Sequence, residues 1–70
     1  MITILGTVYR VIYKSPQEDY CVFVLRDYQE DSHICTGKIA IPKVGEEVEI
    51  KGNFVIHKKY GKQIEVQSIQ

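Results

Sequence analysis

Seventy residues allow one small domain, residues 1–70, and leave no room for a separate catalytic domain. Nine basic and nine acidic side chains cancel, so no overall field draws the protein to nucleic acid or to a membrane, and any such attraction must come from local clusters. The longest unbroken apolar run, Val22 to Leu25, is too short to span a membrane, and the sequence shows no signal peptide. We therefore expect a cytoplasmic protein without a membrane partner.

Strand signals dominate the chain. Valine, isoleucine, tyrosine and phenylalanine, which favour a half-buried sheet, recur in short runs separated by turn residues. No window of a dozen residues has a 3.6-residue apolar period, so the sequence predicts no long helix. The expected strands are residues 6–13, 20–25, 33–41, 46–57 and 62–69.

Alternation assigns the faces of these strands, because successive side chains point to opposite sides of a sheet. The residues expected to point inward are Cys21, Phe23, Leu25, Val48, Ile50, Phe54, Ile56, Ile64 and Val66. Gly52 lies in an inward row, which predicts a bend or bulge. The first strand is apolar on both faces, which is typical of a strand that bends and serves two sheets. Glu47 and Glu49 lie on the opposite, solvated face of the fourth strand.

The connections carry turn residues, among them Pro16, Gly45 and Gly61. Five strands joined by short turns, with little or no helix, predict an all-β protein, a small five-stranded OB-fold-like barrel. An SH3-like barrel is the main alternative. Only residues 42–47 are available for the helix that often joins the third and fourth strands of an OB fold, so this helix is expected to be absent or a single turn.

Enzyme signatures are missing from the sequence. It contains no GxxxxGK[ST] phosphate loop, no GxSxG elbow and no HExxH pair. Cys21 and Cys35 lie far apart and form no zinc-like grouping with His33 or His57, so we expect free, buried thiols and no metal site. His33 lies in a polar hairpin without an evident partner. We expect no catalysis and no cofactor in this chain.

Charge is unevenly distributed along the neutral chain. From Lys51 to Lys62 there are four lysines and no acid, and this stretch includes the predicted loop between the fourth and fifth strands. In an OB barrel this loop and the loop between strands one and two flank the usual ligand groove. Aromatic rings stack on unpaired bases and lysines neutralise phosphates. The candidate nucleic-acid-binding residues are Tyr13, Lys14, Tyr20, His57, Lys58, Lys59, Tyr60 and Lys62.

Two alternatives stay open for this basic loop. Lysine-rich turns are commonly just solvated, and three lysines are a small electrostatic footprint. The ring of Tyr60 could also lie back over the end of the barrel, with Gly61 making the turn. In the first loop, Glu18 and Asp19 would repel a phosphate chain.

Five short motifs are distributed along the chain: Gly6-Thr7-Val8, Tyr20-Cys21-Val22-Phe23, Gly45-Glu46, Gly52-Asn53-Phe54 and the turn His57-Lys58-Lys59-Tyr60-Gly61-Lys62-Gln63. Together these motifs resemble the N-terminal OB domain of the RecD-like (RecD/TraA family) DNA helicases. The resemblance covers nearly the whole chain, from about Ile2 to Gln67. The chain departs from the family at Lys58, where proline is usual, and at Ile64, where an aromatic residue is common.

This resemblance implies that the chain is a fragment, the N-terminal part of a longer ATP-dependent 5′-to-3′ helicase. ATP and Mg²⁺ would act in the motor of the parent protein, and none of its ATP-binding motifs is in these residues. The expected partners are single-stranded DNA and the remainder of the helicase chain. The alternative function is a structural or protein-interaction module that docks on the helicase body without touching DNA.

Overall fold

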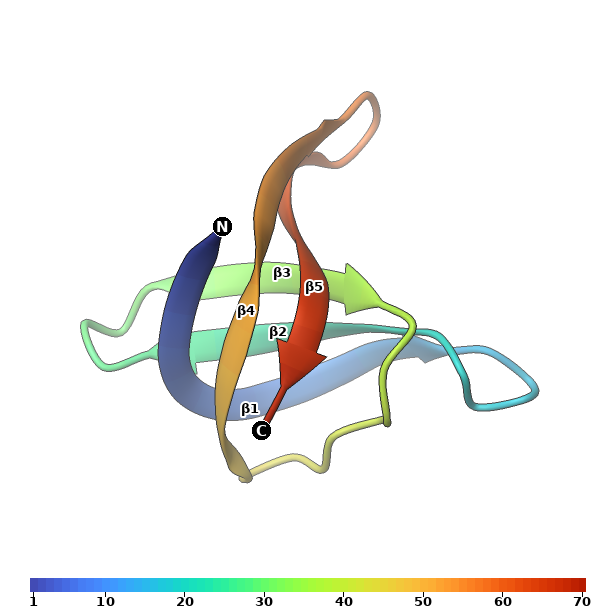
Figure 1. Ribbon diagram of the computed structural model, residues 1–70, viewed down its shortest axis with the longest axis horizontal. Coiled ribbons are helices and arrows are strands. Elements are labelled where there is room, and N and C mark those ends of the chain that lie inside the picture. The colour runs from blue at the N-terminus through green and yellow to red at the C-terminus, as the bar shows by residue number, and fades with distance from the viewer.

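The computed structural model describes all 70 residues, and they form a closed barrel of five strands without a helix. The strands are β1 (Ile2–Lys14), β2 (Cys21–Asp27), β3 (Ser32–Gly37), β4 (Glu47–His57) and β5 (Gly61–Ile69). They follow the order β1-β2-β3-β5-β4 around the barrel, and only β3 and β5 pair in parallel (Figure 1). The prediction of an all-β OB-fold barrel is confirmed. No helix is present that is long and apolar enough to cross a membrane.

β1 bends and joins both halves of the barrel, as the apolar residues on both of its faces predicted. Residues 2–7 pair with β4 and residues 6–14 pair with β2. Two register shifts interrupt the second ladder, between Val8 and Arg10 and between Val11 and Tyr13. Such irregularities increase the local twist of a strand, which allows the sheet to close and leaves the barrel without a free edge. β1 begins earlier than expected, at Ile2 rather than at residue 6.

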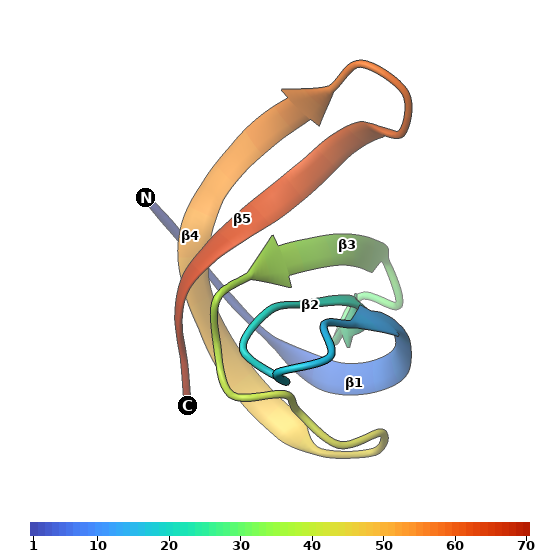
Figure 2. The same ribbon diagram turned by 90° about the vertical axis from the view of Figure 1, so that its right-hand side faces the viewer.

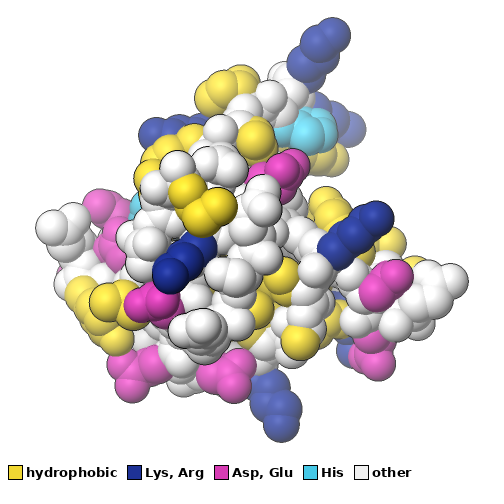
Figure 3. All heavy atoms as spheres, viewed as in Figure 1, with side chains coloured by type: hydrophobic (Ala, Val, Ile, Leu, Met, Phe, Trp, Pro, Cys, Tyr) yellow, Lys and Arg dark blue, Asp and Glu magenta, His cyan; other side chains and the backbone are white.

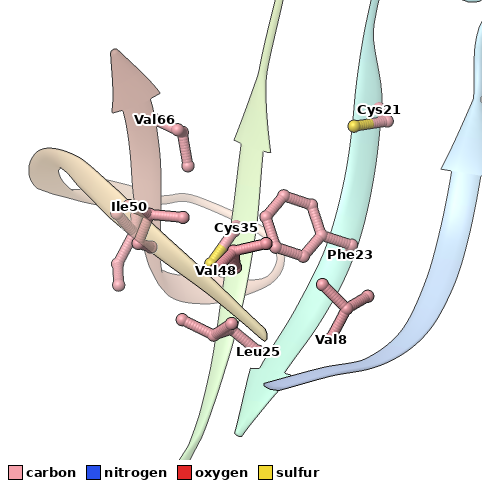
Figure 4. Packing of buried hydrophobic residues seen from close by; sticks show 9 residues of the cluster. Val8, Cys21, Phe23, Leu25, Cys35, Val48, Ile50 and Val66 are labelled. Carbon is pink, nitrogen blue, oxygen red and sulfur yellow. The ribbon is translucent and has the colours of Figure 1, made fainter. Parts of the chain in front are cut away.

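The core fills the barrel with side chains from all five strands (Figure 4). Phe23 and Leu25 from β2 are fully buried. Cys21 and Cys35 are also fully buried and free, as predicted, and burial raises the pKa of the Cys35 thiol to about 12. The buried apolar residues are Val8, Cys21, Phe23, Leu25, Cys35, Val48, Ile50, Ile64 and Val66.

β4 departs from the prediction in its second half. Val48 and Ile50 are buried, but Phe54 is 44 % exposed and Ile56 is 77 % exposed, so their expected place in the core was wrong. The predicted irregularity at Gly52 is present as a register shift between Lys51 and Gly52. β1 pairs with β4 only as far as Gly52, so beyond this point the β4–β5 hairpin leaves the barrel. We call residues 53–63 the arm, and Figure 2 shows it projecting past β3.

β3 is shorter than expected. It ends at Gly37, and residues 38–41, predicted as strand, belong to an irregular connection that reaches β4. Ile39 and Ile41 nevertheless pack against the core from this connection. These two residues are therefore apolar because the connection packs them against the core, and not because they pair in a strand.

His33 has a partner, contrary to the expectation from the sequence. Its Nε2 donates a hydrogen bond to Oδ2 of Asp27 over 2.8 Å. The other oxygen of Asp27 accepts from the backbone N–H groups of Gln29 and Asp31. One carboxylate therefore joins the end of β2 to the beginning of β3.

Candidate nucleic-acid interface

All the candidate binding residues lie in two loops or at the ends of the strands that these loops connect. The β1–β2 loop comprises residues 15–20, and the β4–β5 loop comprises residues 58–60 at the tip of the arm. Figure 2 shows β3 between the two loops. The two loops therefore flank the β2–β3 face, as expected for an OB barrel.

The β1–β2 loop is held by Ser15. Its hydroxyl accepts hydrogen bonds from the backbone N–H groups of Asp19 and Tyr20, and its backbone N–H donates to the carbonyl of Tyr20. This closure brings the rings of Tyr13 and Tyr20 together edge to face, with their centroids 6.4 Å apart. The two rings are 50 % and 37 % exposed. A pair of partly exposed rings at the base of a loop can receive a flat ligand such as a base.

Lys14 is engaged within the same loop. Its Nζ lies 3.4 Å from Oε1 of Glu18, and both side chains are more than half exposed. Exposed pairs of this kind contribute little to stability and are easily exchanged for another anion. Asp19, however, is also exposed in this loop, so the loop as a whole does not attract phosphate.

His57 organises the β4–β5 loop. Its Nδ1 accepts hydrogen bonds from the backbone N–H groups of Lys59 and Tyr60, over 3.1 and 3.3 Å. Gly61 follows with a φ of 80°, in the left-handed region that glycine adopts without strain, as the turn prediction required. His57 therefore acts as the side-chain acceptor that shapes the turn.

Tyr60 does not lie over the barrel. Its ring is 61 % exposed and lies against the ring of His57, with centroids 4.9 Å apart and planes tilted by 35°. Nζ of Lys59 lies 5.5 Å from the centroid of the same ring. The alternative interpretation, in which the Tyr60 ring lies back over the end of the barrel, is thus wrong. The ring instead stands in solvent at the tip of the arm.

The lysines of the arm are free of acidic partners. Lys58 and Lys59 are exposed in the loop, and Nζ of Lys62 lies 4.0 Å from the centre of the Phe54 ring. Figure 3 shows basic side chains around the projecting hairpin, whereas acidic and basic groups are interspersed over the body of the barrel on this face. The arm is thus a local basic region on a neutral protein.

A half-buried surface lies between the two loops. Strand pairing aligns Tyr13 with Val22, Val22 with Thr36, and Thr36 with Glu65 across four strands. These side chains point outward, because they alternate with the buried Cys21, Phe23 and Cys35. We call the outward, half-buried residues of β2 and β3 the floor; they are Val22, Val24, Ile34 and Thr36.

Sequence reasoning missed the floor and Phe54 as parts of the site. The alternation of β2 did place Val22 and Val24 outward, but which outward residues lie between the loops depends on the register with β1, β3 and β5. The aromatic candidates come together as two separate pairs, one in each loop, and no contact joins the loops to each other.

The arrangement offers surfaces that can bind a ligand. No three His, Cys, Asp or Glu side chains gather closely enough to hold a metal ion. The two tyrosine-containing pairs provide stacking surfaces, and the arm lysines provide positive charge beside the half-buried floor. Stacking surfaces and positive charge are the elements of single-stranded nucleic-acid binding.

Comparison with known families agrees with this geometry. A family model described as the OB-fold domain of the ATP-dependent DNA helicase YrrC matches residues 1–70. No curated protein matches the chain. The match covers the whole barrel, including both loops and the arm. The chain belongs to the family of OB-fold domains of the ATP-dependent DNA helicase YrrC.

Proposed function

We propose that the domain is the non-catalytic N-terminal accessory module of a RecD-like 5′-to-3′ DNA helicase and that it contacts single-stranded DNA. The observation that carries the proposal is the arm, which holds an exposed Tyr60 ring among lysines that have no acidic partner. Family membership supports the link to a helicase, and OB barrels commonly bind nucleic acid on this face.

The contacts follow from the chemistry of the two loops. Lys58, Lys59 and Lys62 contact phosphates, because these three lysines lie close together in the arm. Tyr60 stacks a base at the arm, and the Tyr13–Tyr20 pair stacks another at the opposite loop. Lys14 contributes only after it leaves Glu18. ATP and Mg²⁺ act in the motor of the longer cytoplasmic protein, since this chain has no phosphate-binding loop.

Titration of a labelled single-stranded oligonucleotide with the 70-residue domain tests the proposal. We expect saturable binding at low ionic strength, weakened roughly tenfold when Lys58 and Lys59 are both changed to alanine. The matched control changes Lys43 and Lys51 to alanine, because these exposed lysines lie outside both loops. Absence of saturable binding at low salt, or equal loss in the control, would contradict the proposal.

A second candidate function is docking on the helicase body. An open hollow of about 520 Å³ lies away from both loops, beside the turn between β2 and β3. Its lining includes three exposed apolar side chains, Tyr9, Tyr28 and Val44, and the Arg26 guanidinium lies 4.1 Å from the centre of the Tyr9 ring. If this hollow docks on the helicase body, Val44→Asp should weaken the docking and make the domain more sensitive to proteolysis in the longer chain. The same substitution should leave the DNA affinity of the isolated domain unchanged. Unchanged proteolysis would exclude docking through this hollow.

A further inference from the structure

Gln63 is the one polar or charged side chain that the fold buries. It is only 9 % exposed, whereas the other buried residues are apolar, glycine or proline. Its amide takes part in none of the side-chain hydrogen bonds of the domain. Every fully enclosed side-chain nitrogen or oxygen has a partner, so the amide of Gln63 must still reach the surface.

Strand pairing places Gln63 next to the floor. Gln63 is opposite Val55 in β4, and the residue after it, Ile64, pairs with Cys35 of β3. Because β3 and β5 run parallel, Ile34 lies abreast of Gln63, and both side chains point away from the core that Cys35 and Ile64 enter. The amide therefore lies among half-buried apolar neighbours between the floor and the β4–β5 loop.

Polar groups of a buried side chain are nearly always hydrogen-bonded in folded proteins. The amide of Gln63 has no protein partner and reaches the surface, so in the free domain only water can satisfy it. The amide carries one donor group beside one acceptor oxygen, and the hydrogen-bonding edge of an unpaired base presents the same two functions side by side. A ligand with this edge can thus replace the water at the exposed amide.

We propose that Gln63 hydrogen-bonds the Watson–Crick edge of an unpaired base that lies on the floor. This inference rests on the proposed function and specifies how the strand is oriented. The bases face the floor, and the phosphates lie outward on the arm lysines. Glu65, which is exposed and aligned with Thr36 of the floor, disfavours the opposite orientation because it would repel phosphate. Duplex DNA is excluded, because its base edges are already paired.

A double-change cycle tests the proposal: one change removes the Gln63 amide from the protein, and the other removes the bases from the DNA strand. The ligands are single strands of about 12 nucleotides, within the site size of one OB barrel, either with normal bases or with a central abasic tract of the same charge. We expect Gln63→Met to weaken binding of the normal strand roughly tenfold, as loss of a two-hydrogen-bond base contact does, and to leave binding of the abasic strand unchanged. Gln29→Met is the matched control, since Gln29 is an exposed glutamine in the turn between β2 and β3.

Three outcomes separate the possibilities. Equal losses on normal and abasic strands show a merely structural role for Gln63 and overturn the proposal. Failure of wild-type protein to bind either strand overturns the proposed function itself. Should Gln63→Met unfold, as thermal melting would show, Gln63→Glu replaces it, because this isostere removes the donor while filling the same space. An unchanged ratio between the two strands in a folded Gln63→Glu protein would then refute the base contact.

Discussion

Asp27 joins β2 to β3 through a single carboxylate, and this makes stability sensitive to acid. Its hydrogen bond from His33 is the main reason why the pKa of Asp27 lies below its ordinary value, with the backbone N–H groups of Asp31 and Gln29 adding to the effect. A carboxylate with a lowered pKa in the folded state contributes stability above its unfolded pKa. That contribution is lost as the pH falls through the lower, folded pKa.

We therefore expect Asp27→Asn to lower the melting temperature at neutral pH. The difference from wild type should shrink as the pH falls through the lowered pKa of Asp27, because the wild-type carboxylate then also becomes protonated. Thermal melts from neutral to acidic pH measure this. Asp31→Asn serves as the control, because the exposed side chain of Asp31 makes no hydrogen bond and only its backbone contacts Asp27. A constant difference between Asp27→Asn and wild type at all pH values would contradict the assignment.

Gly52 is the residue at which the hairpin leaves the barrel. A β-carbon there would collide with the backbone carbonyl of Glu65, on the strand paired with it. Gly52→Ala should therefore lower the free energy of unfolding by about 3 kcal/mol, the upper range for forced overpacking, in urea denaturation. The neighbouring Asn53→Ala, at an exposed position, should change it by less than about 0.5 kcal/mol. Equal effects would show that the strand crossing is looser than described.

For single residues, the sequence predicts on which face of a strand a side chain lies but not which residue it contacts. Alternation correctly placed Cys21, Phe23 and Leu25 inward, because a strand has a fixed period of two. The partner of His33 was not predictable in this way, since the hydrogen bond crosses a turn whose geometry depends on Asp27. Gln63 was missed for a similar reason, because its burial comes from neighbouring strands.

The arm shows the same limit for a whole element. From Val48 to Ile56 the inward positions are apolar except for Gly52, and this alternation placed Phe54 and Ile56 in the core. The barrel, however, uses β4 only as far as its pairing with β1, which ends at Gly52. Alternation defines the side on which a residue lies, but only the length of the neighbouring strand decides whether that side is covered.

Substitutions along β4 test this division. Phe54→Ala and Ile56→Ala should each lower the free energy of unfolding by less than about 1 kcal/mol, because both side chains are substantially exposed. Ile50→Ala, at the fully buried position in the same strand, should cost about 3 kcal/mol, through lost transfer energy and the cavity it leaves. Chemical denaturation measures all three. A loss near 3 kcal/mol in Phe54→Ala would mean that the arm folds back on the core in solution.

For the molecule as a whole, the fold was predictable and the site only in part. Five strands, a bent first strand and the missing helix follow from local composition and turn residues. The β1–β2 and β4–β5 loops were identified because their place in the chain order fixes them in an OB barrel. The floor between them depends on register across four strands, which one strand's sequence does not contain.

Because the whole molecule is neutral, we can predict how strongly its DNA binding depends on salt concentration. Because nine basic and nine acidic groups cancel, phosphate attraction must come from local clusters, and the arm gathers Lys58, Lys59 and Lys62 without an acidic partner. Three neutralised phosphates on a single strand correspond to a slope of about −2 for the logarithm of the binding constant against the logarithm of salt concentration.

Binding titrations over a range of salt concentrations measure this slope. Changing Lys58 and Lys59 together to alanine leaves one arm lysine, so the slope should fall to roughly −0.7. The Lys43 and Lys51 double substitution keeps the arm intact and should retain the slope of wild type. A slope that is steep in all three proteins would show that phosphates are bound elsewhere on the barrel. A flat slope in wild type would mean that the arm lysines do not contact phosphate, even if Tyr60 still stacks a base.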